Sequence, residues 1–554
     1  MIAPLTDAQQ RWVDTTFDEL TRRERIAQLI VPTLTPDTAA PLSIADYVAT
    51  TGIGGGHLFG GPVETVRELA AEAQQAAKVP LLLTGDFEAG CGPRIREAVA
   101  WPGEMALGAA GDEALAGAMG ASIAAEATGA GYNWAFGPIV DLAAVKDYQR
   151  QVDSYGRDPQ AVARLAVAQI EAMQAGGLAA CAKHFPGDGF DDRDQHLMTL
   201  VNPLTAEDWW ANSAVPFQAA IEAGVWSIMV SCIGLPSLDG SSGDPRNPTP
   251  AVVSRPLITD LLRRRMGFEG VIVSDALNMG GVSYRHRQLD RYRLALAAGN
   301  DVILFVRDVQ TTLDYLERCV EQGDLEAEAI DAAARSVLSL KARLGLDEQR
   351  MVDGLTCGKV YRALRGQDDA DRLAERSVTL VRDSAGRVPL GVERGATVAV
   401  VLITNQEAER FEPDAFVTAL EKGGCKVTLI RDPQTDAVYD RVANGEFDVV
   451  VTAFYYPVQY GWNTTRIHGP TSRCVMSGFP IAHPDTTPVW ISFSNPYHLY
   501  ELPFMDPYLV TYSPSPASQR AAAGALLGRT PITGKLPCDL DGFWSIGDGI
   551  RREE

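Results

Sequence analysis

The sequence predicts an α/β protein in which an N-terminal (β/α)8 TIM-type barrel is followed by a smaller, doubly wound α/β sandwich domain. Three observations lead to this fold class. The chain of 554 residues is long enough for two domains, its 46% hydrophobic and 22% charged residues are typical of a globular protein, and short apolar runs alternate with longer helical patterns. We expect the barrel over residues 1–345, a linker over 346–375 and the sandwich over 376–554.

Eight short apolar, β-rich runs predict the strands of the barrel: 26–34, 55–59, 80–85, 132–140, 179–184, 227–231, 270–274 and 301–305. Helical patterns lie between them, at 63–78, 114–127, 159–175, 206–223, 258–266 and 309–322. Strands that alternate with helices pair in parallel. Eight such repeats fit a closed barrel, in which the chemistry takes place at the C-terminal ends of the strands.

The same alternation resumes on a smaller scale in the second half of the chain. Strands are expected at 397–403, 426–430, 447–454, 487–493 and 508–512, with helices at 413–421 and 518–527. This pattern predicts the doubly wound sandwich.

Charge and cysteine usage exclude several classes of protein. Acidic residues outnumber basic ones by 71 to 49, and such a surface repels phosphate backbones and anionic lipids, so we expect no nucleic-acid and no membrane partner. Residues 1–17 lack the features of a secretory signal, which makes the cytoplasm the expected location. The eight cysteines form neither a Cys-x-x-Cys motif nor a cluster at zinc spacing, so we expect reduced thiols and no metal site.

Two places at expected strand ends carry side chains suited to catalysis. Asp275 comes after the apolar run 271–273 and Ser274, and this run would hold its carboxylate rigidly, although a strand-end Asp can also cap the next helix. Asp194 and His196 are separated by one residue, so in an extended loop both side chains share a face and the carboxylate can orient the imidazole. The alternative for this second place is an acidic loop that is merely solvated.

Lys183 and His184 end another expected strand and stand beside Gly and Pro residues. They suit a polar pocket that binds hydroxyl groups, whereas as a plain structural pair they would be buried with satisfied partners. A Schiff-base role for Lys183 is less favoured, because no apolar surrounding that would depress its pKa is evident.

Several motifs resemble glycoside hydrolase family 3, in matching order and spacing. They are the KHFPG segment at 183–187, the SDALNM segment at 274–279 with its upstream glycine, AAGND at 297–301, and the stretches 133–141, 154–159, 494–497 and 534–537. The resemblance covers almost the whole chain. It implies a barrel followed by a sandwich domain and an enzyme that cleaves glycosidic bonds in small carbohydrate substrates, with no cofactor and no metal.

Within that family, the spacing of Asp194 and His196 resembles the Asp-x-His dyad of the β-N-acetylglucosaminidase branch. The resemblance implies that Asp275 is the nucleophile, that His196 is the acid/base and that Asp194 is its partner. It also implies that a set of polar residues binds the sugar: Asp86, Arg94, Arg150, Lys183 and His184. The expected product is a terminal β-linked N-acetylglucosamine-type sugar, released with retention of configuration through a covalent glycosyl-enzyme.

Three positions depart from this branch. Asp188 stands where His is usual, Asp153 where Arg is usual, and Cys91 replaces the first Arg of the motif after Asp86, while 150–155 resembles the Arg-x-x-Glu-Ser-Tyr pattern of the β-glucosidase branch. An exo-β-glucosidase or β-xylosidase therefore remains the alternative, as does a phosphorylase, because a His acid/base repels a phosphate acceptor less than a carboxylate does. A sugar-binding protein without catalysis is a further alternative.

An aromatic run at 454–462 in the second domain has two interpretations. Aromatic rings suit pyranose faces, so the run could form a lip for the sugar. It could equally form a domain interface or an oligomer contact, and a homo-oligomer is left open as a partner.

Overall fold

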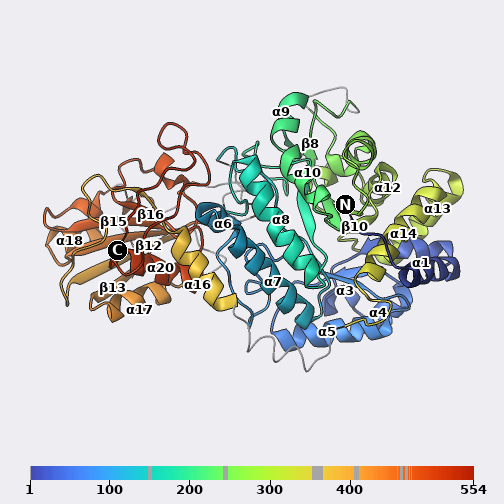
Figure 1. Ribbon diagram of the computed structural model, residues 1–554, viewed down its shortest axis with the longest axis horizontal. Helices are drawn as coiled ribbons and strands as arrows, with labels where there is room; N and C mark the ends of the chain where they lie inside the picture. The colour runs from blue at the N-terminus through green and yellow to red at the C-terminus, as the bar shows by residue number, and fades with distance from the viewer. Residues whose placement is uncertain are drawn as a thin grey trace. The chain divides into compact units, whose positions relative to one another are not determined.

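The computed structural model (Figure 1) describes residues 2–146, 152–240, 247–351, 366–404, 411–433, 435–457, 460–461, 466–467, 472, 474–475 and 477–553. The chain forms two compact α/β units. The first comprises Met1–Val99, Ala116–Leu142 and Val162–Arg365, and the second comprises Ala100–Leu115, Ala143–Ala161 and Gly366–Glu554. The domain bounds expected from the sequence stay a prediction, because these units are defined by packing and not by position along the chain.

Unit 1 is built on parallel strands, and each of the eight expected apolar runs overlaps one of them, although β5 and β9 extend one and two residues beyond their runs. Five strands pair in the order β1 (Ile30–Val31), β10 (Val302–Leu304), β9 (Val271–Ala276), β7 (Ser227–Val230) and β5 (Cys181–Phe185). Three more pair as β2 (Gly55–His57), β3 (Leu82–Gly85) and β4 (Trp134–Ala135). Parallel bridges lie between these two sheets at Thr33 with His57, at Trp134 with Ala179 and at Ile139 with Lys183. A separate parallel pair consists of β6 (Leu200–Val201) and β8 (Ile233–Gly234).

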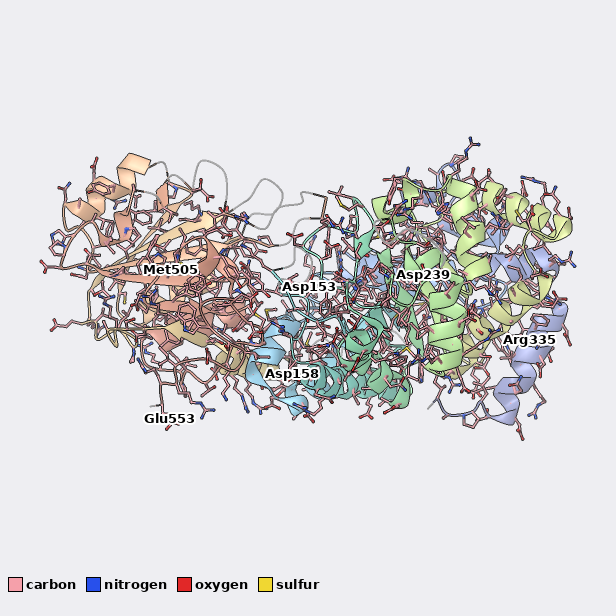
Figure 2. The ribbon with its side chains drawn as sticks, turned by 90° about the horizontal axis from the view of Figure 1, so that it is seen from above. Asp153, Asp158, Asp239, Arg335, Met505 and Glu553 are labelled. Carbon is pink, nitrogen blue, oxygen red and sulfur yellow. The ribbon has the colours of Figure 1, made fainter. Side chains whose placement is uncertain are left out.

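The strands of unit 1 alternate with helices, as expected from the sequence. Their bounds are α1 (Asp7–Glu19), α2 (Arg22–Ala27), α3 (Pro36–Ala39), α4 (Ile44–Thr51), α5 (Val63–Ala76), α7 (Glu113–Ala130), α8 (Pro159–Ala175), α9 (Ala206–Ala211), α10 (Ala214–Glu222), η1 (Ala251–Val253), η2 (Pro256–Arg265), α11 (Gly280–Ser283), α12 (Gln288–Ala298), α13 (Val309–Gln322) and α14 (Ala327–Arg343). Helices α1 and α14 lie side by side (Figure 1). Arg335 of α14, labelled in Figure 2, forms an ion pair with Asp14 of α1 at 2.8 Å.

Two sequence-based expectations about these elements are wrong in detail. The run 26–34 begins inside α2, because Thr21 and Glu24 form a capping box that starts a helix there. The expected helix at 206–223 is two helices, α9 and α10. Pro216 lies in the first turn of α10, where its missing N–H costs nothing, whereas in the interior of a single helix it would remove a hydrogen bond.

Unit 2 contains a six-stranded sheet with helices packed on it. The strand order is β11 (Thr379–Arg382), β16 (Tyr508–Val510), β15 (Thr487–Ser492), β14 (Val449–Tyr455), β12 (Thr397–Thr404) and β13 (Lys426–Arg431), with only β11 antiparallel to its neighbour. Its helices are α6 (Glu104–Ala110), α16 (Gly366–Ser377), α17 (Asp414–Lys422), α18 (Thr435–Ala443), η3 (Phe479–Ile481), η4 (Tyr497–Tyr500) and α20 (Pro516–Leu526). The five expected strands are present, while β11 is an additional edge strand.

Two segments from the first third of the chain belong to unit 2. In α6, the carbonyl of Ala109 accepts a hydrogen bond from the amide of Lys535 at 3.1 Å, and Arg376 of α16 pairs with Asp112 at 2.8 Å. Further along, Arg157 forms an ion pair with Asp539. Among the described residues, no helix is long and apolar enough to cross a membrane.

Candidate active site

Asp275 lies near the C-terminal end of β9, where the strand leaves the apolar core. Val271, Ile272 and Val273 come before Ser274 and are all buried. The backbone that carries the Asp275 carboxylate is therefore held rigidly. One carboxylate oxygen accepts a hydrogen bond from the amide of Ala276 at 2.7 Å. The next helix, α11, begins after Met279 without a side-chain cap. Asp275 is therefore not the cap of the following helix.

Ser231 connects Asp275 to the loop that follows β5. Its hydroxyl contacts both Oδ2 of Asp275 and Oε1 of Gln195, and it is completely buried at the end of β7. Gln195 stands between the two residues expected to form the acid/base dyad. Asp275 and the loop of the Asp194–His196 pair are thus linked through one buried hydroxyl group.

The dyad itself is formed in the structure. Nδ1 of His196 lies 2.8 Å from Oδ1 of Asp194, and the same oxygen accepts the backbone N–H of His196 at 2.8 Å. The Asp194 side chain is fully buried, whereas that of His196 is 34% exposed. The alternative of a merely solvated acidic loop is wrong for this pair, because a buried carboxylate orients one ring nitrogen and leaves proton transfer to the other.

Two glycines after Asp275 let the dyad loop approach closely. The amide of Gly280 donates to the carbonyl of His196 at 2.7 Å, and the amide of Gly281 donates to the carbonyl of Gln195 at 3.1 Å. A Cβ at Gly280 would stand 2.4 Å from the carbonyl oxygen of Leu197. Only glycine permits these contacts, which hold His196 to the segment that follows the nucleophile.

A second polar cluster lies at the ends of β3 and β5. Nζ of Lys183 is 3.1 Å from Asp86 and 2.5 Å from Glu88. Burial alone would lower the pKa of Lys183, but the two carboxylates outweigh burial and raise it above the usual value. Lys183 is therefore a permanent cation, which opposes the Schiff-base alternative.

The charges around Asp86 keep it ionised. Burial disfavours its charged form, yet Lys183 and Arg94 outweigh burial and lower the pKa of Asp86 to about 2. Arg94 approaches to 3.9 Å, and Nε2 of His57 lies 3.7 Å away. Burial, with some help from Arg94 and Lys183, lowers the pKa of His57 to about 4, so that ring is neutral near pH 7.

His184 is oriented by Asp141, at the end of the apolar run that contains β4. Nδ1 of His184 lies 2.8 Å from Oδ2 of Asp141, and Oδ1 accepts the amides of both His184 and Asp188. Lys183 and His184 are thus buried and well partnered, and they nevertheless stand in the same polar cluster as Asp86. Such groups, fixed by their neighbours, are suited to bind sugar hydroxyls.

The remaining sequence-predicted residues are placed less completely. Arg150 lies outside the described residues, so its predicted role stays a prediction. Asp153 is half-buried in the segment Ala143–Ala161 of unit 2 (Figure 2). The expected aromatic run at 454–462 is only partly described, and its two interpretations stay open.

The structure adds four side chains to the site for which the sequence predicted no role: His57, Glu88, Asp141 and Gln195. Glu88 and Asp141 lie at strand ends, where polar residues deserve attention in any parallel α/β protein. His57 lies inside an expected strand, and a His at such a position is typical of a buried core residue. Gln195 carries no signal in the sequence, because its role depends on Ser231, 36 residues further along.

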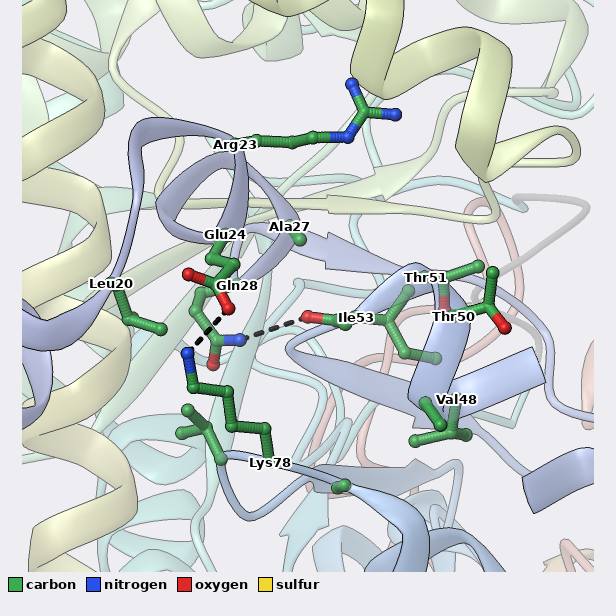
Figure 3. A pocket seen from close by; sticks show the side chains of 14 residues that line it. Leu20, Arg23, Glu24, Ala27, Gln28, Val48, Thr50, Thr51, Ile53 and Lys78 are labelled. Carbon is green, nitrogen blue, oxygen red and sulfur yellow. Dashed lines mark hydrogen bonds and ion pairs between the residues drawn. The ribbon is translucent and has the colours of Figure 1, made fainter. Parts of the chain in front are cut away.

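Among the described residues, no group of three or more His, Cys, Asp or Glu side chains is arranged so that it could hold a metal ion. A pocket of about 150 Å3 has Gln28, Gly52 and Val79 among its lining residues. Gln28 is labelled in the close view of this pocket (Figure 3). These residues precede β1, β2 and β3, so the pocket lies at the strand ends opposite to Asp86. Beside it, fully buried Lys341 donates to Gln28 at 2.6 Å, and burial lowers the pKa of that lysine well below its usual value.

Comparisons with known proteins show which family the chain belongs to. Residues 21–340 match the model described as the N-terminal domain of glycosyl hydrolase family 3. A β-N-acetylglucosaminidase/β-glucosidase from Cellulomonas fimi is 31% identical over 550 residues, which cover 97% of this chain and 96% of that protein. The chain belongs to glycosyl hydrolase family 3. A β-hexosaminidase from Chromobacterium violaceum is 33% identical over 253 residues, covering 44% of this chain and 68% of that protein.

Solved structures extend the similarity of this family 3 member to both units. A β-glucoside phosphorylase, BglX, superposes with a TM-score of 0.87 at 27% identity, covering 98% of this chain and 97% of the other. A family 3 β-N-acetylglucosaminidase from Paenibacillus sp. gives a TM-score of 0.81 at 26% identity, covering 94% and 99%. The expected family and the two-unit α/β architecture are confirmed.

Proposed function

We propose that this protein is a retaining exo-glycosidase that releases a terminal β-linked N-acetylglucosamine-type sugar from small glycosides. The observation that carries the proposal is the preformed Asp194–His196 pair, whose loop is hydrogen-bonded to the segment directly after Asp275. The names of the Cellulomonas, Chromobacterium and Paenibacillus relatives support the substrate class.

The proposed reaction has two displacements. The carboxylate of Asp275 forms a bond to the anomeric carbon while the glycosidic C–O bond breaks, and His196 gives its proton to the departing oxygen. His196 then takes a proton from water, whose oxygen displaces Asp275 and restores the free enzyme. Asp194 orients the ring of His196 while the ring gives up its proton in the first displacement and regains one in the second.

The polar cluster supplies the sugar-binding groups in this proposal. Asp86, Lys183, His184 and Arg94 would bind hydroxyls of the terminal sugar, and Arg150 completes the set by resemblance. Each of the first three is fixed by a charged neighbour, so little ordering entropy is lost on binding.

We also propose that the eight strands of unit 1 close into the (β/α)8 TIM-type barrel, with domain bounds at 1–345, 346–375 and 376–554. The three parallel bridges between the two sheets support closure, because they supply the pairing between β1 and β2 and between β4 and β5. A cytoplasmic location is part of the proposal. The seven cysteines that the structure describes are free and buried, as in a reducing compartment.

The experiment that tests the function is turnover of aryl β-N-acetylglucosaminides by the wild type and by Asp275→Ala. We expect the substitution to lower kcat by several orders of magnitude with an unchanged circular dichroism spectrum, because the side chain lies at a strand end and not in the core. A 2-fluoro glycoside should label Asp275 covalently. Labelling of another residue would contradict the assignment, and absence of turnover in the wild type would favour a sugar-binding protein without catalysis.

A second candidate is a phosphorylase or β-glucosidase, which the likeness to BglX favours. It is tested by adding inorganic phosphate to the same assay and by offering aryl β-glucosides and β-xylosides. Formation of a sugar 1-phosphate in place of the free sugar would identify phosphorolysis. Glucosides cleaved at least ~10-fold more efficiently, which is about 1.4 kcal/mol in transition-state binding, would identify the glucosidase.

A further inference from the structure

Two phenylalanines stand at strand ends of unit 1 without a role in the proposed reaction. Phe59 follows β2 and its large apolar side chain is 51% exposed. Phe305 directly follows β10 and has a φ of 57°, a left-handed backbone that a bulky residue rarely adopts. The two rings lie 6.2 Å apart at 25°, so they form one stacked surface, which we call the aromatic pair.

The aromatic pair is joined to both ends of the proposed sugar site. Leu304, the residue before Phe305, pairs with Ala276, the residue after Asp275. On the other side, the ring of His57 lies 4.9 Å from that of Phe59 and 5.1 Å from that of Phe305. His57 in turn reaches Asp86 at 3.7 Å. The aromatic pair therefore lies between the nucleophile and Asp86.

The strand order places the polar cluster on the other path between the same two residues. Asp86, which follows β3, contacts Lys183 of β5, and β5 pairs with β7. Ser231, which follows β7, donates to Phe185 of β5 through its amide and contacts Asp275 of β9 through its hydroxyl. Along this path the side chains are charged or hydroxylated. Along the path through β2 and β10 they are aromatic, and His57 is neutral. The site thus has one polar side and one apolar side.

A pyranose ring has the same division. Its substituents at C2, C3 and C4 are contiguous and polar, whereas the opposite edge consists of the ring oxygen, C5 and the C6 methylene. With the anomeric carbon at Asp275 and the hydroxyls on the polar cluster, the C5–C6 edge meets the aromatic pair. We propose that Phe59 and Phe305 bind this edge and determine specificity for a hexose with an uncharged C6 group; the inference rests on the proposed function.

The test compares two aryl β-glycosides that differ only in the C6 group: the N-acetylglucosaminide and its pentose analogue, 2-acetamido-2-deoxy-β-xyloside. The Phe59→Ala and Phe59→Leu variants are assayed on both, with glucoside and xyloside as the pair if the wild type prefers glucosides. We expect the ratio of kcat/KM for hexoside over pentoside to fall about 10-fold in Phe59→Ala, and less in Phe59→Leu, which keeps apolar volume without a ring face.

Phe504→Ala provides the matched control, because Phe504 is 52% exposed and lies in unit 2 beside Trp490. It should leave the ratio unchanged. If the wild type turns over the hexoside and both Phe59 variants keep its ratio, the inference is overturned while the function stands. If the wild type turns over neither pair of glycosides, the proposed function fails first.

Discussion

His196 depends on a carboxylate that water does not reach. Asp194 is fully buried and binds both the ring and the backbone amide of His196, so the ring is oriented before any substrate arrives. A carboxylate on Nδ1 fixes the orientation of the ring and leaves the other ring nitrogen to move a proton. In the proposed reaction, the leaving group would therefore meet a group that is already positioned.

We predict that His196→Ala slows substrates with poor leaving groups far more than substrates with activated phenols. Protonation by a general acid contributes roughly 100-fold to 10000-fold for an alkyl leaving group and little for a nitrophenol, which departs as the anion. The slope of log kcat/KM against leaving-group pKa measures this effect. Asp194→Asn should steepen the slope less, and equal losses on all substrates would contradict the role.

Glu126 is a buried acid close to the loop that carries Arg94. It lies on α7, is 1% exposed, and accepts the backbone N–H of Val99 at 3.0 Å. Burial raises its pKa to about 7, although the bonds from Val99 and Cys91 act in the opposite direction. A carboxyl that is neutral in the folded protein and charged in the unfolded one links stability to pH.

We predict that this linkage destabilises the protein between about pH 4.5 and pH 7. The pKa of Glu126 is higher in the folded protein than in the unfolded chain. Its contribution to the free energy of unfolding is therefore complete below the unfolded pKa of 4.5 and is lost as the pH rises through the folded pKa of about 7. In the wild type, the free energy of unfolding should fall by on the order of 3 kcal/mol over this pH range, and Glu126→Gln should abolish that fall. Urea unfolding at pH 5 and pH 8 measures it, with exposed Glu68→Gln on α5 as the control that keeps the wild-type difference.

At the scale of elements, the active site depends on two loops that approach each other without room for side chains. The segment 194–196 follows β5, α11 follows β9, and Gly280 and Gly281 join the two by backbone hydrogen bonds. Thr199 adds a hydrogen bond to the carbonyl of Gly281 at 2.6 Å. The distance between His196 and Asp275, the proposed acid/base and nucleophile, is therefore set by backbone contact.

We predict that Gly280→Ala moves the dyad loop and lowers activity. The new Cβ would stand 2.4 Å from the backbone of Leu197, so the loop must shift, and small displacements of a catalytic group cost about 100-fold. The loss should again be larger for poor leaving groups, since His196 is displaced. Gly391→Ala is the control, because nothing lies within 4 Å of its Cβ position; a Gly280→Ala enzyme with normal kcat would contradict this account.

At the scale of the whole molecule, the second unit is not a continuous piece of chain. It also includes Ala100–Leu115 and Ala143–Ala161; the first of these carries α6, which packs on α16 and contains the fully buried Met105 and Leu107. Tyr155 is likewise 1% exposed. Segments that are distant in sequence thereby share one compact unit.

We predict that residues 366–554 expressed alone do not fold stably. Without the two N-terminal segments, the fragment would expose the apolar surface against which Met105, Leu107 and Tyr155 are buried, and lose the ion pair between Arg376 and Asp112. Circular dichroism with thermal unfolding should show no cooperative transition. The full chain is the reference, and a fragment that melts cooperatively at the same temperature would contradict the prediction.

The sequence determined much of this protein by local pattern. All eight apolar runs overlap a parallel strand, the five strands of the second half are present, and the pairing of Asp194 with His196 follows from a spacing of two. These features are readable because alternation, periodicity and short spacing act between neighbours in the chain. The family motifs pointed to Asp275 and Lys183 as well, which lie at or near the C-terminal ends of β9 and β5.

Only the tertiary structure decided which distant residues meet. The contact of Ser231 with Gln195 and Asp275, the position of Glu88 on Lys183, and the aromatic pair of Phe59 and Phe305 join residues that are 36 to 246 positions apart. The same holds for the two early segments that complete unit 2. No local pattern contains this information, because these contacts form only when strand order, loop approach and burial have brought separate parts of the chain together.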